Sequence, residues 1–481
     1  MQERNYYLKN IQKLLILVLT LVVVLVLFSH FTRFADNQIS LKFFVDDPLA
    51  FIAKTFIFFG MLISLIFVHN SKEMIKTNKE LVKIHILISS MLAMFLVSTN
   101  NFIVVILSAV FIIIINYLII SAGKDDLKKT FLDNGRIRDE KTAESSLKYL
   151  AVGQLVIVLM FWFCGNFVGM LGKISSCDIT NIMEKITFMR YMDSEVIFYM
   201  MLLSLSIFGL LCMLIPFHLS LIDAIEGISY PIVFYLITVP KFAALFFLFR
   251  FNLLIVDMTS VFKFHWYTVM TFIVLATMLI SSLMIFNQNS LKKILFYFSN
   301  FLAAIILLGF LSTGSKNYYL IISSSITYIL LFSSATYLFL LAGTFCENSN
   351  HGDHIDTLKI AFKNSYIKFC AITLLLSFIM LPPFTSSNII YPIISNLVMK
   401  RDFTIGLFGL FCAFNFAVFL LKTSEYLFRK DELIFNVKGN IDIKLSIKQN
   451  CLMLGIAIVL LSAGVYGSRG VEVLVRYLRY Y

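Results

Sequence analysis

The chain has few charged residues. Asp, Glu, Lys and Arg make up 14% of its 481 residues, whereas about a quarter of the residues in soluble proteins are charged. Hydrophobic residues account for 59% of the chain and stand in long unbroken runs. A water-soluble fold cannot bury so much apolar surface. The composition therefore excludes a separate soluble catalytic domain and predicts that lipid surrounds most of the chain.

The residue patterns of several kinds of site are missing. The seven cysteines include no Cys-x-x-Cys pair, which argues against a disulfide framework and an iron–sulfur site. There is no nucleophile elbow and no phosphate-binding loop. His351 and His354 could share a helix face, but Gly352 between them is a poor helix residue and no third ligand has a diagnostic spacing. We interpret these histidines as part of a solvated loop and predict no metal site.

The net charge of +12 does not indicate a nucleic-acid-binding protein. The Lys and Arg residues stand in short segments between apolar runs, and they do not gather on one face of a folded domain. Such segments are typical of membrane loops that contact lipid headgroups. We therefore expect lipids such as cardiolipin as partners, and no nucleic acid.

The apolar runs predict an all-α, polytopic transmembrane helix bundle that forms one membrane domain over residues 1–481. The first run, Leu14 to Phe34, is too long for a signal-peptide core and is interpreted as a membrane helix. We expect about 13 to 14 helices, some of them broken, with an antiporter-like core at about 82–422. Polar loops are expected at 122–146, 346–367 and 422–449, and the tail 468–481 could form an interfacial helix. The runs lie at approximately 11–34, 51–68, 82–98, 101–121, 147–173, 196–216, 229–250, 266–286, 292–312, 318–345, 368–383, 389–398, 403–422 and 451–467.

Lys241 lies near the middle of the run 229–250. An ammonium group at that depth costs about 2.5–3.5 kcal/mol on insertion scales, and such residues face the interior of a bundle and mark ion or proton paths. We predict that Lys241 belongs to a proton path. The alternative is a structural lysine paired with a carboxylate or with the end of a half-helix.

A group of polar residues and prolines separates the run 229–250 from the run before it. Asp223 and Glu226 are three positions apart, so on a helical turn they share a face and could anchor a helix entrance or a partner subunit. A solvated turn explains the same spacing equally well. The group consists of Pro216, Phe217, His218, Asp223, Glu226, Gly227 and Pro231.

These residues carry a resemblance to a known family. The pattern resembles that of subunit 2 of the proton-pumping NADH:quinone oxidoreductase, respiratory complex I, and it reads Pro216-Phe217-His218-x4-Asp223-x3-Gly227-x3-Pro231-x6-Thr238-x2-Lys241. Three further elements are similar to that subunit in order and spacing, namely Ser146-x-Lys148-Tyr149, Gln288-x3-Lys292-Lys293-x3-Tyr297 and Leu381-Pro382-Pro383. The sister subunits and the multisubunit cation/proton antiporters share this architecture.

The resemblance implies an antiporter-like fold of about 14 helices among other membrane-arm subunits. It implies no redox cofactor in this chain, because flavin, iron–sulfur clusters and quinone are held by partner subunits. By the same resemblance, the proton path comprises Lys241, Lys292, Lys293 and His218. Structural or coupling roles fall to Pro216, Asp223, Glu226, Pro231, Lys148, Pro382 and Pro383.

The departures from the family pattern concern its titratable residues. Where the family has Glu, Lys, His and Lys, this chain has Val110, Leu211, Leu302 and Ile390, and Ser220 and Ile222 replace a Trp and a Pro. A proton cannot pass Leu or Ile unless water fills the gap. We expect a subunit that keeps its place in the membrane arm with a weakened or lost proton channel of its own. The alternatives are an antiporter subunit and a purely structural subunit; the expected location is the mitochondrial inner membrane or, alternatively, a bacterial plasma membrane.

Overall fold

The computed structural model describes the chain in several stretches, and in all of them the regular elements are helical. This confirms the prediction of an all-α fold. The predicted runs at 11–34, 318–345, 368–383 and 451–467 lie outside these stretches. The described residues are 48–70, 76–99, 101–122, 135–171, 209, 211–215, 217–226, 228–256, 260–312, 387–399 and 402–428.

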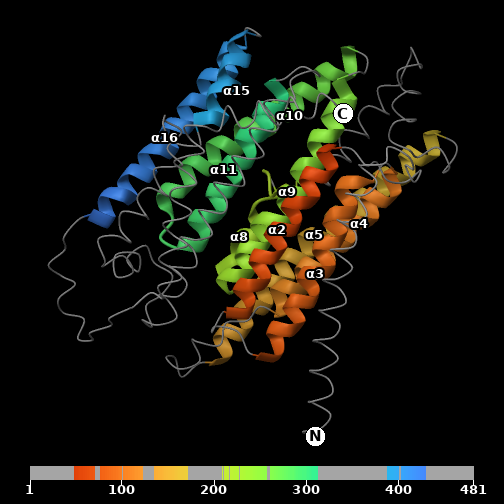
Figure 1. Cartoon of the computed structure of the whole chain (residues 1–481), viewed down its shortest axis with the longest axis vertical. Helices are drawn as coiled ribbons and strands as arrows, with labels where there is room; N and C mark the ends of the chain where they lie inside the picture. Colours follow the sequence, from red (N-terminus) through yellow and green to blue (C-terminus); the bar gives the residue numbers. More distant parts are fainter. Residues whose placement is uncertain are drawn as a thin grey trace, which may run out of the picture. The chain divides into compact units, whose positions relative to one another are not determined.

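The chain divides into two compact units, residues 1–270 and 271–481. In the first unit, α9 contacts α2, α3 and α4, while α5 contacts α4 and α8 (Figure 1). The helices described in this unit are α2 (Pro48–Asn70), α3 (Lys76–Ser98), α4 (Phe102–Ala122), α5 (Gly135–Leu171), α8 (Leu219–Glu226) and α9 (Tyr230–Val256).

Close approach of the helices in the first unit depends on small residues. A Cβ atom on Gly60 of α2 would lie 3.0 Å from Val239 of α9, and one on Gly153 of α5 would lie 2.8 Å from Ile113 of α4. Lipid tails are as apolar as the helices, so close packing takes over the role of the hydrophobic effect here. α9 is the centre of this packing, since its membrane span Tyr230–Phe249 is entirely buried.

Two helices extend into segments that the sequence assigned to loops. α5 begins at Gly135, although a loop was expected over 122–146, and α16 (Phe403–Phe428) continues past the expected loop start at 422. The charged residues of α5 can support a helix outside lipid, because Lys148 forms an ion pair with Glu144 one turn away at 3.0 Å. Apolar runs mark the part of a helix that lies in lipid, and a helix can continue into water beyond it.

A helix break lies between Cys212 and α8. Met213 has a φ of 57°, and the N–H of Leu214 donates to the carbonyl of Gly209 at 2.9 Å. A left-handed residue followed by this wide hydrogen bond is the usual way a helix ends. Phe217 folds back over Gly209, where any Cβ would lie 2.5 Å from the ring. The polar segment around His218 therefore interrupts the helical path, as its sequence indicates.

The second unit is described by α11 (Leu291–Ser312), α15 (Ser387–Met399), α16, η3 (Ile285–Asn287) and most of α10 (Ser260–Met284). Aromatic rings fill its interior: Phe416 of α16 stacks on Phe301 of α11 with ring centroids 4.4 Å apart. A Cβ on Gly309 of α11 would lie 3.0 Å from Ile393 of α15.

Seven helices among the described residues are long and apolar enough to cross a membrane. Large apolar side chains are exposed along several of them, including Phe59, Phe111, Phe272 and Phe414. Rings exposed on transmembrane helices face lipid in a multi-pass protein. The chain is therefore a polytopic membrane protein.

Candidate functional site

Lys241 lies at the centre of the first unit. It stands 12 residues into the 20-residue span of α9 and is 0% exposed. Pro240 directly precedes it inside the helix. A proline in a helix cannot donate to the carbonyl four residues earlier, here that of Leu236, and it bends the helix at that point. The structure confirms that Lys241 is buried within protein, and it adds a local break in the backbone hydrogen bonds that the sequence interpretation overlooked.

The helix break before α8 lies beside this lysine. Cys212 is fully buried and close enough to Lys241 for an electrostatic interaction between thiol and ammonium. Leu211, which replaces a family lysine, is buried next to it. The left-handed Met213 ends the helix at this place. A thiol and an apolar side chain thus occupy the segment in which the family pattern has a second cation.

The other positions where the family has titratable groups are also apolar. Val110 of α4 and Leu302 of α11 are buried, and Ile390 of α15 is half-buried. None of these side chains can bind a proton. The central row of titratable residues expected from the resemblance is therefore interrupted at each of these positions.

Polar side chains of four helices meet at one depth of the first unit. The Ser89 hydroxyl of α3 donates to Oδ1 of Asn116 of α4 at 3.3 Å. Asn116 is also hydrogen-bonded to the Tyr149 hydroxyl of α5. The Tyr235 hydroxyl of α9 donates to the carbonyl of Ile86 at 3.5 Å and lies near Ser89. We call Tyr149, Asn116, Ser89 and Tyr235 the polar layer; all four are buried.

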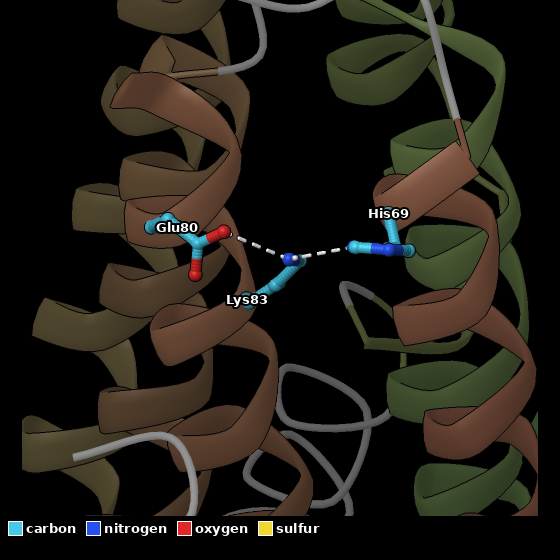
Figure 2. A network of polar contacts seen from close by, with 3 residues as sticks. All are labelled: His69, Glu80 and Lys83. Carbon is cyan, nitrogen blue, oxygen red and sulfur yellow. Dashed lines mark hydrogen bonds and ion pairs between the residues drawn. The ribbon is translucent and has the colours of Figure 1, made fainter. Parts of the chain in front are cut away.

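A charged cluster joins the end of α2 to the start of α3 (Figure 2). Lys83 Nζ lies 2.9 Å from Oε1 of Glu80 and 3.4 Å from Nδ1 of His69. The side chains of Lys83 and Glu80 are only 11% and 24% exposed. We call His69, Glu80 and Lys83 the hairpin cluster. Sequence reasoning missed it, because its members fall at the ragged ends of two apolar runs.

A second buried lysine lies in the first unit. Lys54 of α2 is 5% exposed and stands inside the span Ala50–His69. The reasoning that singled out Lys241, a charge inside an apolar run, applies to Lys54 as well and could have found it. The first unit therefore buries more cationic groups than the sequence interpretation recognised.

The remaining predicted residues are spread over both units. His218 is buried just before α8, and Asp223 and Glu226 both lie on the helical turns of α8, which confirms their shared helix. Pro231 is the second residue of α9, a position without need of its missing N–H. Lys148 is exposed beside Glu144. In the second unit, Lys292 is buried and Lys293 half-buried in the first turn of α11.

Some predicted residues lie outside the described stretches. They are Pro216, Pro382, Pro383, His351 and His354. Within the described stretches, no three His, Cys, Asp or Glu residues lie close enough to hold a metal ion. Lys241 and the polar groups around it therefore form the candidate site.

Comparison with known proteins connects this site to a family. Residues 125–418 match the family described as NADH:quinone oxidoreductase/Mrp antiporter, TM. NADH-quinone oxidoreductase subunit N 2 of Chloroherpeton thalassium is 27% identical over 282 residues, which cover 57% of this chain and 51% of that protein. Subunit N of Pelagibacter ubique is 24% identical over 374 residues, 77% of this chain and 74% of that protein. The match thus spans about half the length of the first relative.

Solved structures share the fold over nearly the whole chain. A chain of respiratory complex I from Thermus thermophilus superimposes with a TM-score of 0.70 at 16% identity, covering 96% of this chain and 94% of that one. A chain of the Mrp complex from Dietzia superimposes with a TM-score of 0.74 at 13% identity, covering 96% and 91%. The antiporter-like bundle expected from the sequence is therefore confirmed.

Proposed function

The chain belongs to the NADH:quinone oxidoreductase/Mrp antiporter transmembrane family, and on this premise we propose that it is a membrane-arm subunit of a proton-pumping NADH:quinone oxidoreductase. The observation that carries the proposal is the buried Lys241 on α9. Relatives named subunit N support this branch of the family over the antiporter branch. The expected neighbours are other antiporter-like membrane-arm subunits, with lipids such as cardiolipin around them.

In this role the chain handles protons and not electrons. The amine of Lys241 binds a proton to become an ammonium ion and later releases it, and no bond between heavy atoms changes. NADH oxidation and quinone reduction belong to partner subunits that hold flavin, iron–sulfur clusters and quinone.

Apolar residues limit this function. They stand where the family has titratable groups and are called here the apolar central row: Val110, Leu211, Leu302 and Ile390. Val110 and Leu211 are buried in the first unit and have side chains that cannot carry protons. We expect this subunit to move fewer protons through the central row than a family member that has all four titratable groups. A residual proton path therefore depends on Lys241 and on water.

Substitution of Lys241 in the intact complex tests the proposal. Membranes carrying Lys241→Ala should oxidise NADH but take up fewer protons per NADH, measured with a pH-sensitive dye in vesicles. Lys422→Ala is the matched control, because Lys422 is exposed over the ring of Phe286. Equal proton uptake in both variants would show that this subunit is structural.

Copurification decides between the two branches of the family. The proposal expects the chain in a complex that contains NADH-oxidising subunits. The similarity to an Mrp complex chain makes an assembly of antiporter subunits the second candidate. Isolation with antiporter subunits alone would establish that second function. The membrane is an energy-transducing one, the mitochondrial inner membrane or a bacterial plasma membrane, and the bacterial relatives support the latter.

A further inference from the structure

The hairpin cluster, the polar layer and Lys241 follow one another along the first unit. α2 runs antiparallel to α9, because Phe67 contacts Phe234 and Phe56 contacts Phe242 at ring-centroid distances of 5.5 Å and 5.6 Å. The end of α2 that carries His69 therefore lies at the end where α9 begins. The hairpin cluster thus stands at the same end of the unit as the start of α9.

The spacing along the helices places the polar layer between the cluster and the buried lysine. Ser89 follows Lys83 by six residues on α3, and Lys241 follows Tyr235 by six residues on α9. Each interval corresponds to about 9 Å along a helix. Ser89 and Tyr235 lie close enough for a side-chain hydrogen bond, although their hydroxyls donate to Asn116 and to the Ile86 carbonyl. The polar layer therefore lies about midway along the helices between the hairpin cluster and Lys241.

The hairpin cluster differs from an ordinary surface ion pair. The Glu144–Lys148 pair of the same unit has side chains that are 64% and 51% exposed, whereas those of Glu80 and Lys83 are 24% and 11% exposed. Drawing a pair out of water costs desolvation energy, and the pair alone does not return it as stability. The hairpin cluster thus keeps a carboxylate, an imidazole and an ammonium together at one end of the bundle.

We propose that protons reach Lys241 from the end of the bundle where α2 meets α3, through the hairpin cluster and the Ser89–Tyr235 pair, and bypass the apolar central row. The proposal rests on the proposed function. It assigns proton loading to Glu80, relay to Ser89 and Tyr235, and positioning of Ser89 to Asn116. Asn116 acts through the hydrogen bond that it accepts from the Ser89 hydroxyl.

The steps of the relay conserve protons and leave every heavy-atom bond intact. The Glu80 carboxylate takes a proton from the aqueous phase when its ion pair with Lys83 opens, and passes it to water inside the bundle. The Ser89 hydroxyl accepts a proton on oxygen and releases its own to Tyr235, and the Tyr235 hydroxyl releases its own to water beside Lys241; the two hydroxyls then turn back to Asn116 and to the Ile86 carbonyl. The neutral amine of Lys241 becomes an ammonium ion, and Glu80 returns to a carboxylate.

The alternative is that the polar layer only holds helices together. Hydrogen bonds between membrane helices are worth about 0.6 kcal/mol on average, which is enough to be retained for packing. Ser90 provides a matched control, because it is buried beside Ser89 on the same helix but donates to the Leu87 carbonyl of its own helix at 2.8 Å. A packing role affects assembly, and a relay role affects proton transfer in assembled complex.

The first test measures proton uptake per NADH in vesicles that contain the full complex, with assembly followed on native gels. Ser89→Ala and Glu80→Gln should each lower the ratio as far as Lys241→Ala does, since the proposal places all three residues on one path. Ser89→Thr should restore it, and Ser90→Ala should leave it unchanged. Equal ratios in Ser89→Ala and Ser90→Ala would overturn the route. A loss for Lys241→Ala alone would also overturn it and would leave the proposed function intact.

The second test does not depend on redox activity or on which complex contains the chain. Full-length chains with Ser89→Cys or Ser90→Cys are treated in native membranes with a small, charged, thiol-directed reagent, and labelling at each position is measured by mass spectrometry. A thiol must ionise in water to react, so position 89 should label about tenfold faster than position 90. Equal labelling of the two positions would show that no water reaches the polar layer from the hairpin cluster.

Discussion

Rings pack between helices in both units of the chain, but the polar contacts of the described residues differ between the units. In the first unit, polar side chains bond across helices, as Ser89 does with Asn116 and Lys83 with His69. In the second unit, Ser282 of α10 contacts the Cys412 thiol of α16, the hydroxyls of Thr277 and Ser299 donate to carbonyls of their own helices, and phenylalanine rings fill the space between helices. Cross-helix hydrogen bonds require a specific partner, whereas rings require only volume. Function is therefore expected where the contacts are specific, in the first unit.

Removing a ring from the second unit should have the largest effect on stability. Phe301→Ala deletes a fully buried ring stacked on Phe416 and should lower the free energy of unfolding by about 3–5 kcal/mol. The measurement is thermal unfolding of the purified complex in detergent. Phe414→Ala is the control, because that ring is 67% exposed and faces lipid. Equal losses in both variants would mean that the ring stack does not hold this unit.

Adding a methyl group between helices of the first unit should have the next largest effect. A Cβ at Gly153 lies 2.8 Å from Ile113, so Gly153→Ala should destabilise by about 1–3 kcal/mol through overpacking. Gly165→Ala provides the opposite case on the same helix, since a Cβ there meets nothing within 4 Å. It should stabilise α5 by up to about 1 kcal/mol. Both unfolding temperatures are measured by thermal melts. If they shift in the same direction, α4 and α5 are not closely packed at Gly153.

Breaking the polar layer should have a smaller effect on stability. Asn116→Ala removes the acceptor of Ser89 and a partner of Tyr149 and should cost about 0.6–1.7 kcal/mol, the range of hydrogen bonds between membrane helices. Ser121→Ala on the same helix should change little, because that exposed hydroxyl bonds to the carbonyl of Leu118. If Asn116→Ala unfolds at the same temperature as the unsubstituted protein, the polar layer does not stabilise the first unit, and the units do not differ in this respect.

The smallest effect is expected at the exposed ion pair of α5. Glu144→Gln should cost about 0.3–0.5 kcal/mol, and less at high salt, because exposed pairs are weak and screened. Glu80→Gln should cost more and respond less to salt, because it leaves the buried Lys83 without its carboxylate. Melts at low and high salt compare the two. The same salt response in both variants would show that the hairpin cluster is an ordinary surface pair.

Prediction from the sequence succeeded where the property belongs to a single helix. The run 229–250 predicted a membrane helix with a buried lysine, and α9 has both. The spacing of Asp223 and Glu226 left a helical turn and a solvated turn equally open, and the structure has the helix α8 there. The loop predicted over 122–146 was wrong in its second half, because α5 already begins at Gly135. The length of an apolar run measures only the part of a helix that lies in lipid. The family was recognised from spacing within one segment, which needs no knowledge of packing.

Partners across helices could not be predicted in this way. Ser89 and Ser90 are adjacent, equally buried and chemically identical, yet one bonds to Asn116 and the other to its own helix. Which of them faces a neighbour depends on the rotation of α3 about its axis. That rotation is set by small residues and rings on other helices, and periodicity in an almost uniformly apolar segment does not show it.

The sequence by itself determined that this chain lives in a membrane, where most of its helices lie and that one of them carries a lysine at mid-depth, because hydrophobic length and charge are properties of single segments. Only the tertiary structure decided that α9 is enclosed on all sides, that a helix break brings Cys212 to Lys241, and that α3, α4, α5 and α9 share a polar layer. The physical reason is that a polar group in lipid must find a partner, and the packing of neighbouring helices chooses which one.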